Sequence, residues 1–319
     1  MPRGPRQIQP DHLTEITIKT FQARFLLKPN RLVNSLIIGV LAMAQKRYNI
    51  NICAVVVLCN HLHLLIIPPS EEDAMRFCQY ISSNISREVG RLRRWTGGIF
   101  RRRYSDVVVT HELAAQAGRL RYLLSHGVKE KLCRRPQDWP GVHCAKALLS
   151  GVMKLEGEWI DRSAFYEARR RSERRGARRG KRPRLADHTE TMVLKLSKIP
   201  AWKHLSDEAY RKAIADMIGD ILDEYEDQRL AAPKIVRIAV PADYRPDKTK
   251  SSPKPICHAA SRKERKRFQQ RRRDFVNAYL EASALLKKGA RRALDMFPEG
   301  AFLPPVGLGP LRSPPASSA

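Results

Sequence analysis

Two histidines, His61 and His63, lie one leucine apart inside the apolar stretch 55–70, VVVLCNHLHLLIIPPS. On a β-strand, residues two apart point to the same face, so the two imidazoles would share a face and Leu62 and Leu64 the other. Two neutral imidazoles side by side can hold a divalent metal ion, but a catalytic ion needs at least one further protein ligand. From this spacing alone, two histidines on a half-exposed sheet face, without a metal, are the simpler interpretation.

A third histidine follows a tyrosine in the segment 119–128, RLRYLLSHGV. Tyr122 and His126 are four apart, so on a helix they lie on one face, about a turn from each other. If that face covers the sheet, His126 completes a three-histidine site with Tyr122 beside it. A tyrosine next to a metal suits attack of its phenolate on a phosphodiester, because the cation stabilises charge on the phosphoryl oxygens. The plainer alternatives are a core-packed Tyr122 and a His126 that interacts with the helix dipole.

The charge balance of the chain favours a nucleic-acid partner. Lys and Arg number 60 against 32 Asp and Glu, a formal net charge of +28. Such an excess repels itself unless a polyanion neutralises it, and nucleic-acid phosphates release counterions when cations bind them. A membrane surface is the competing partner. No apolar run reaches the roughly 18 residues of a membrane span, and the N-terminus lacks an apolar signal core. We therefore expect a cytoplasmic, nucleoid-associated protein without a membrane partner.

Arginines and aromatic side chains alternate between residues 91 and 104. This mixture suits a groove for single-stranded nucleic acid, in which phosphates pair with arginine and bases stack on rings. The residues that we expect to contact DNA are Arg91, Arg93, Arg94, Trp95, Arg101, Arg102, Arg103 and Tyr104. The alternative is a solvated helix end followed by a solvated strand edge. Tyr104 is also a rival nucleophile to Tyr122, although it has no metal-type partner four residues later.

The elements that position these residues are expected in the order β-α-β-β-α-β-α. Hydrophobic spacing and turn residues predict strands at 13–27, 50–58, 61–67 and 99–110, and helices at 29–49, 70–95 and 111–128. This order is typical of an α+β class: a ferredoxin-like antiparallel sheet with helices on one face.

Three blocks of the sequence carry a resemblance to a known family. The segments 59–69 (CNHLHLLIIPP), 99–110 (IFRRRYSDVVVT) and 119–141 (RLRYLLSHGVKEKLCRRPQDWPG) resemble, in order and spacing, the HUH single-tyrosine transposases. The likeness is closest to the REP-associated tyrosine transposases and spans about residues 13–150. It implies a DNA transposase that cleaves and rejoins single-stranded DNA, at hairpin-forming repeat ends, through a phosphotyrosine intermediate. Such proteins occur as single chains and as homodimers.

The resemblance also implies roles for individual residues. His61 and His63 would bind Mg²⁺ or Mn²⁺, and Tyr122 would be the nucleophile. The third ligand in the family, four residues after the tyrosine, is usually Asn or Gln, and here it is His126. Because Mg²⁺ prefers oxygen and histidine suits transition metals, this departure favours Mn²⁺ or an altered site. Gly127 replaces a family-like proline and is expected to loosen the helix end.

These departures keep two alternatives open. One is a catalytically degenerate relative that only binds hairpin DNA or RNA. The other is an HUH nickase of the replication-initiator or relaxase type, which shares the cleavage chemistry.

The rest of the chain is strongly basic. We expect a catalytic domain over 1–150, a basic linker over 151–200, a helical basic extension over 201–300 and a disordered tail over 301–319. The run 169–184, with ten basic residues and one acid, is expected to be extended, either as an electrostatic tether or as a solvated linker. A basic helix over 262–290 would clamp a hairpin stem or be an ordinary charged surface helix. The six cysteines form no Cys-x-x-Cys pair, so we expect them reduced and buried or incidental.

Overall fold

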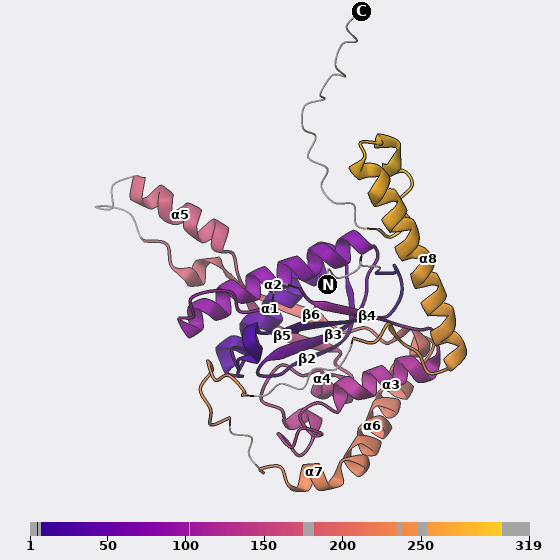
Figure 1. The fold of residues 1–319 in the computed structure, drawn as a ribbon. Helices are drawn as coiled ribbons and strands as arrows, with labels where there is room; N and C mark the ends of the chain where they lie inside the picture. Colours follow the sequence, from indigo (N-terminus) through magenta and orange to yellow (C-terminus); the bar gives the residue numbers. More distant parts are fainter. Residues whose placement is uncertain are drawn as a thin grey trace, which may run out of the picture. The chain divides into compact units, whose positions relative to one another are not determined.

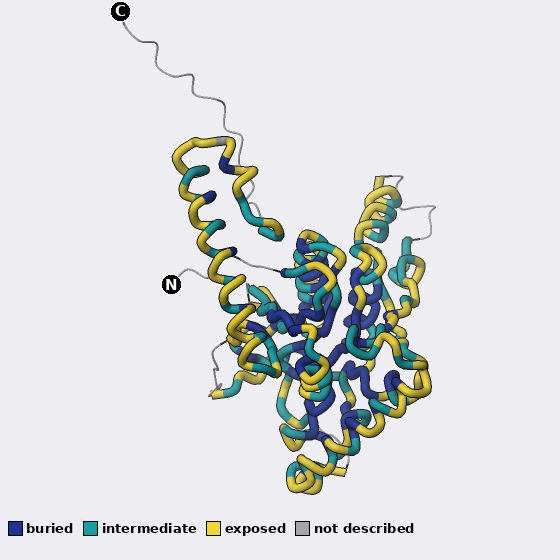
Figure 2. The backbone as a smooth tube through the Cα atoms, turned by 90° about the vertical axis from the view of Figure 1, so that its right-hand side faces the viewer, coloured by how far each residue is buried: buried dark blue, intermediate teal, exposed yellow. Residues whose placement is uncertain are grey.

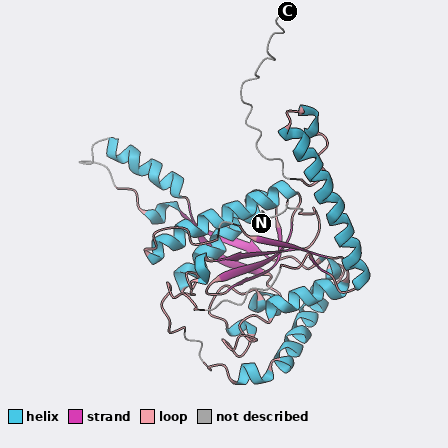
Figure 3. Ribbon diagram, in the orientation of Figure 1, coloured by secondary structure: helices cyan, strands magenta, loops and turns pink. Residues whose placement is uncertain are grey.

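A five-stranded sheet in the order β2-β3-β1-β4-β7 carries the histidine pair (Figures 1 and 3). The strands are β1 (Thr14–Lys19), β2 (Asn51–Val57), β3 (His61–Ile67), β4 (Ser105–Val109) and β7 (Cys257–His258). All neighbours are antiparallel except β4 and β7. The order of the first four strands is that of a ferredoxin-like sheet, so the predicted α+β class is confirmed. The computed structural model describes residues 5, 8–101, 103–174, 182–234, 238–247 and 254–301.

Helices cover both faces of this sheet (Figure 1). On one face lie α1 (Arg31–Tyr48) and α2 (Glu71–Arg93), which pack against each other. On the other lie α3 (Leu113–Leu124), α4 (Ala145–Ser150) and α6 (Asp207–Glu224). The strands between the two layers are largely buried (Figure 2), so the predicted one-sided helix layer was too simple.

The first two helices begin where the sequence predicts. The side chain of Asn30 accepts a hydrogen bond from the backbone N–H of Val33, and that of Ser70 from Asp73. Each satisfies a backbone donor that the first turn of a helix leaves without an intrahelical partner.

The strand register turns the histidine pair to one face. Thr17 of β1 lies opposite His63, and Lys19 lies opposite His61. Ile16, Ile18, Leu62 and Leu64 are fully or almost fully buried on the opposite face. Because side chains alternate along a strand, Glu15 and Thr17 point to the same side as the two histidines.

Three predicted boundaries differ from the structure. The first strand ends at Lys19 rather than at 27, because Gln22 and Ala23 adopt positive φ angles of 53° and 56° in a short 3₁₀ turn. Strand β4 begins at Ser105 rather than at 99, so the basic segment precedes it. Helix α3 ends at Leu124, and the turn after it carries His126.

A second, two-stranded sheet lies in the range that we expected to be a basic linker. It pairs β5 (Lys154–Ile160) with β6 (Thr189–Lys195) and packs against α1. A Cβ on Gly39 would lie 2.0 Å from the backbone oxygen of Glu158, so the close approach requires glycine. Between the strands, α5 (Arg162–Arg174) makes the start of the run 169–184 helical rather than extended. Residues 175–181 lie outside the described residues.

The chain divides into two compact units, Ile8–Lys266 and Met1–Gln7 with Arg267–Ala319. The first holds both sheets, α1 to α6 and α7 (Glu226–Leu230). The second holds most of α8 (Arg262–Lys287), the predicted basic helix, whose buried residues Phe268, Phe275 and Ala282 recur every seven positions. The expected disordered tail lies, after residue 301, outside the described residues.

Short 3₁₀ segments complete the described structure: Phe21–Ala23, Pro136–Asp138, Leu185–His188, Pro200–Trp202 and Arg291–Leu294. All six cysteines are free and buried, as predicted. Among the helices that the structure describes, none is both long and apolar enough to cross a bilayer.

Candidate metal centre

His61, His63 and His126 converge, and their candidate ligand nitrogens all lie within 4.8 Å of one another. The His63 ring centroid lies 4.9 Å from that of His61 and 4.7 Å from that of His126. His126 reaches the strand from the turn after α3. The backbone N–H of His126 donates to the carbonyl of Leu123, so this turn continues the helix by about two residues. Helix α3 therefore does lie over the histidine face of the sheet.

Each of these imidazoles is held through its Nδ1 atom. Nδ1 of His61 lies 2.6 Å from the side-chain oxygen of Asn60, and Nδ1 of His63 lies 2.7 Å from Glu15 Oε1. Nδ1 of His126 lies 2.9 Å from an oxygen of Glu130. Because carboxylate and amide oxygens accept hydrogen bonds, each Nδ1 donates, and the lone pair is left on Nε2. Such outer partners fix the tautomer and orientation of metal-binding histidines.

All three imidazoles are held in the neutral form that binds metal. Burial lowers the pKa of His61, His63 and His126, and neighbouring imidazoles and cations lower it further. The hydrogen bond and charge of Glu15 oppose this at His63 without overcoming it. The Nε2 atom of His126 is buried and has no hydrogen-bond partner among the described residues. A buried acceptor of this kind fits a metal ligand.

The nitrogens are more widely spread than those of a loaded site. Two nitrogens that each lie about 2.1 Å from one ion in tetrahedral geometry are about 3.4 Å apart. Because the three ligand nitrogens lie within 4.8 Å of one another, binding an ion would draw them together by up to about 1.4 Å. Small rotations of the three rings can supply such a shift, so the residues present fit a divalent transition-metal ion.

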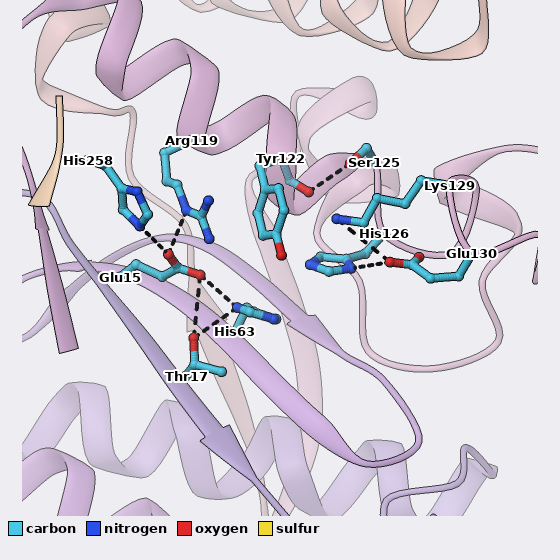
Figure 4. A network of polar contacts seen from close by, with 10 residues as sticks. All are labelled: Glu15, Thr17, His63, Arg119, Tyr122, Ser125, His126, Lys129, Glu130 and His258. Carbon is cyan, nitrogen blue, oxygen red and sulfur yellow. Dashed lines mark hydrogen bonds and ion pairs between the residues drawn. The ribbon is translucent and has the colours of Figure 1, made fainter. Parts of the chain in front are cut away.

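Glu15 links the metal centre to two other parts of the chain (Figure 4). One oxygen meets His63, and the other lies 2.5 Å from Arg119 Nε on α3 and 2.9 Å from His258 Nε2 on β7. The Glu15 side chain is only 3% exposed. Burial alone would raise its pKa, but the hydrogen bonds from His258 and His63 and the contact with Arg119 outweigh burial and hold the pKa well below its usual range. Glu15 is thus a buried carboxylate anion shared by two imidazoles and one guanidinium.

Tyr122 lies beside the histidines with its ring between two cations. Arg119 Cζ and Lys129 Nζ lie 3.7 Å and 3.5 Å from the ring centroid. The ring centroid is 4.9 Å from that of His126 and 6.0 Å from that of His63, and the hydroxyl points toward these two rings (Figure 4). Burial raises the pKa of the phenol, and Arg119 partly opposes the rise.

Gly127 makes hydrogen bonds through both its N–H and its carbonyl. Its φ angle is 91°, and its N–H donates to Glu130 Oε2 at 2.6 Å. Its carbonyl accepts from the backbone N–H groups of Leu132 and Cys133. Proline has no N–H, so glycine here holds Glu130, which in turn holds His126.

The expected DNA-contacting residues are only partly near the centre. The N–H of Arg101 donates to the carbonyl of Lys19, the residue opposite His61, so this segment runs past the end of β1. Arg94 and Arg101 are exposed, whereas Arg103 and Tyr104 are half-buried and precede β4.

The remaining members of that set already have partners in the chain. Arg91 pairs with Glu88 at 2.7 Å, Arg93 donates to the carbonyl of Lys28, and Trp95 packs under Arg24. Arg102 lies outside the described residues.

Sequence reasoning missed five residues around the centre: Glu15, Arg119, Lys129, Glu130 and His258. Local signals existed for three of them. Glu130 follows His126 by four residues, Arg119 precedes Tyr122 by three, and Glu15 is the single acid of β1. For His258, which is 243 residues from Glu15, no local pattern exists.

Comparisons with known proteins add little beyond this geometry. No protein-family pattern matches the sequence, and no characterised protein matches it significantly. The solved structure of a REP-associated tyrosine transposase bound to a REP hairpin superposes with a TM-score of 0.40 at 16% identity, over 47% of this chain and 86% of that one. The structure of a candidate transposase from Deinococcus radiodurans R1 superposes with a TM-score of 0.28 at 15% sequence identity, over 39% of this chain and 95% of that one. Likenesses this weak do not carry a function, which has to be argued from the site.

Proposed function

We propose that this protein is a metal-dependent DNA transposase that cleaves and rejoins single-stranded DNA through Tyr122. The observation that carries the proposal is the meeting of Tyr122 with three neutral histidines. A nucleophile beside a site for a divalent ion is the arrangement that phosphodiester chemistry needs. A three-histidine cluster alone would fit many metalloproteins, and the adjacent tyrosine between two cations narrows the choice.

The proposed metal ligands are His61, His63 and His126. Three imidazoles favour a transition-metal ion over Mg²⁺, which prefers oxygen ligands, so we propose Mn²⁺ as the working ion. When bound, such an ion would withdraw charge from the phosphoryl oxygens of the DNA. Asn60, Glu15 and Glu130 would keep the ligand nitrogens directed inward through the Nδ1 contacts.

Tyr122 is the proposed nucleophile. Its hydroxyl oxygen would form a bond to phosphorus as the bond from phosphorus to one DNA oxygen breaks. The phenol loses its proton and the departing DNA oxygen gains one, so the step is balanced. Arg119, which lies over the ring, favours the phenolate that burial opposes. A DNA hydroxyl would later attack the phosphotyrosine, release Tyr122 and rejoin the strands.

The proposed substrate is single-stranded DNA at hairpin-forming repeat ends of a mobile element. The sequence resemblance suggests this substrate, and the net charge of +28 supports a polyanion. The exposed Arg94 and Arg101, with Arg101 beside the strand end that meets His61, offer phosphate contacts.

The test is formation of a covalent DNA adduct. An end-labelled single-stranded hairpin oligonucleotide is incubated with the protein and Mn²⁺, and denaturing gels report adducts. We expect the wild type and Tyr104→Phe to form the adduct, and Tyr122→Phe to form none. An adduct in Tyr122→Phe would show that the nucleophile is wrong. Tight hairpin binding without an adduct under any divalent cation would instead support a degenerate, DNA-binding relative.

A further inference from the structure

A basic and aromatic hollow lies on the face of the sheet that is covered by α1 and α2. Its volume is about 610 Å³, and it forms where these two helices meet the junction of β5 and α5. The residues that matter here are Arg47, Tyr48, Arg76, Tyr80, Arg87 and Trp159. Helices α1 and α2 lie on one face of the sheet and α3 on the other (Figure 1). Because α1 and α2 line the hollow and α3 covers the histidine face, the sheet lies between the hollow and the metal centre. Its volume falls within the range of about 300–1,000 Å³ typical of ligand sites.

Three aromatic rings are positioned here before any ligand binds. The Tyr48 and Tyr80 rings meet edge to face at 5.9 Å. Trp159 Nε1 donates a hydrogen bond of 3.1 Å to the Tyr80 hydroxyl. All three rings are half-buried, so each keeps some surface open to the hollow. Flat rings that are fixed in this way are platforms for stacking with planar ligands.

Exposed arginines surround these rings. Arg47 lies over both tyrosines, with Cζ 5.8 Å from the Tyr48 centroid and 5.6 Å from the Tyr80 centroid. Arg87 donates to the Asn84 side-chain oxygen at 2.8 Å, a neutral partner that leaves its charge uncompensated. Arg76 pairs with Glu72, but both side chains are more than 60% exposed, so solvent screens the pair.

Two further charged groups of the hollow are already engaged. Arg162 makes a two-pronged contact with the buried Glu88, and the Asp161 carboxylate accepts the N–H of Ala164 at the start of α5. The cations available to a ligand are therefore the exposed Arg47, Arg76 and Arg87. Because Asp161 is the one acid in the lining of the hollow, the net charge of the lining is positive.

We propose that this hollow is a second binding site, for single-stranded nucleic acid. An unpaired base stacks against the platform of Tyr48, Tyr80 and Trp159, and the flanking phosphates pair with Arg47 and Arg87. Stacking explains the fixed rings, and phosphate pairing explains exposed arginines beside them. A helix or strand of another protein would need an apolar surface here rather than a rim of cations.

Part of the hollow lies outside the region of family resemblance. Trp159 and the β5–α5 junction lie beyond residues 13–150, the part that carries the family resemblance. The proposal also does not depend on strand cleavage, since none of its residues contributes to the metal centre. A nucleic-acid strand whose end is held at the metal centre would gain a second attachment in the hollow, on the other face of the sheet.

The first experiment measures binding to a fluorescein-labelled oligothymidylate in EDTA, where no metal is bound, using the full-length protein. The test protein is a double variant of the hollow, Arg47→Gln with Arg87→Gln. The control is a double variant of α6, Arg211→Gln with Lys212→Gln, which also removes two exposed charges. Each phosphate contact to a single strand contributes about 0.7 to the slope of log K against log salt. We expect the pocket variant to reduce the slope by about 1.4 and the α6 variant to leave it nearly unchanged. Equal reductions would mean general electrostatic attraction and overturn the proposal.

The second experiment tests stacking. Tyr48→Phe keeps the ring and is expected to bind like the wild type, whereas Tyr48→Leu is expected to bind about fivefold or more weakly. Circular dichroism checks that both variants are folded. Photo-crosslinking with bromodeoxyuridine in the strand, followed by peptide mapping, should mark Tyr48, Tyr80 or Trp159. Adducts found only elsewhere, or equal binding by the two Tyr48 variants, would overturn the proposal.

Discussion

The candidate metal centre depends on how each imidazole is held. A histidine on a strand can rotate about two side-chain bonds, and an ion binds well only if all three ligand nitrogens already point inward. Here Asn60, Glu15 and Glu130 supply that restraint. Glu15 differs from the other two because it is buried and shared with Arg119 and His258.

Glu15→Gln should therefore weaken Mn²⁺ binding about 10–100-fold, the usual effect of losing an outer-sphere partner. The neutral amide of glutamine no longer attracts the three groups around it, which belong to His63, Arg119 and His258. The His63 ring therefore loses the partner that orients it. Titration calorimetry measures the affinity, and circular dichroism confirms the fold. Glu173→Gln, on the exposed surface of α5, is the matched control and should bind like the wild type. Unchanged affinity in Glu15→Gln would contradict the role given to Glu15.

Buried neutral histidines make stability depend on pH. Burial lowers the pKa of His143 from 6.5 to about 4, and its Nδ1 accepts the N–H of Ala145. Between these two pKa values the unfolded chain binds a proton that the folded chain does not, so stability falls as pH falls from 6.5 toward 4. From pH 7 to pH 5 this single group removes about 2 kcal/mol.

His143→Asn keeps an acceptor near Ala145 and removes the titrating group. Urea unfolding at pH 7 and at pH 5 should show a smaller loss of stability in the variant than in the wild type, by about 2 kcal/mol. The lowered pKa values of His61, His63 and His126 act in the same direction in both proteins, so the difference isolates His143. The same loss in both proteins would show that His143 is not held neutral.

At the scale of elements, α1 joins the two sheets. One side covers the main sheet, and the other meets the β5–β6 pair through Gly39 and Gly157. A Cβ on Gly157 would lie 2.3 Å from the Ser35 carbonyl oxygen, so both surfaces of the contact are glycine. The backbones of helix and strand approach too closely for any side chain.

Gly39→Ala should destabilise the protein by about 3 kcal/mol or more, because the methyl group can be accommodated only if the β5–β6 pair moves away from α1. Urea unfolding measures the loss. Gly219→Ala, inside α6 with open space around it, is the control and should stabilise by about 0.5–1 kcal/mol. A neutral Gly39→Ala would contradict the close packing of helix and strand.

At the scale of the whole molecule, the unit Ile8–Lys266 contains the entire candidate centre, including His258. Strand β7 brings His258 to Glu15 by pairing with β4 at the sheet edge. Strand β7, which is far from the histidines in sequence, thus contacts Glu15, the residue that holds His63.

Two truncations separate these contributions. A chain ended after Lys266 should keep the Mn²⁺ affinity of the full protein, because every residue of the centre remains. A chain ended after residue 253 lacks His258, and we expect its affinity to fall about tenfold or more. Calorimetry with both chains makes the comparison, and equal affinities would exclude a contribution from β7.

The sequence by itself determined the α+β class, the order of the elements along the chain and the pairs of candidate residues that share a face. These follow from local rules, since alternation assigns His61 and His63 to one face and four-residue spacing assigns Tyr122 and His126 to another. The boundaries of β1 and β4 were less predictable, because the left-handed residues Gln22 and Ala23 carry no strong sequence signal.

Only the tertiary structure decided that the two faces meet and what holds the histidines there. The contacts of Glu15 on β1 bring together residues from β3, α3 and β7. The hollow around Tyr80 is formed by α1, α2 and the β5–α5 junction. Such contacts depend on how elements pack, and packing is set by the sum of many weak side-chain interactions rather than by any spacing along the chain. The physical reason is that hydrophobic periodicity tells a strand or helix which face to bury but not which partner will cover it.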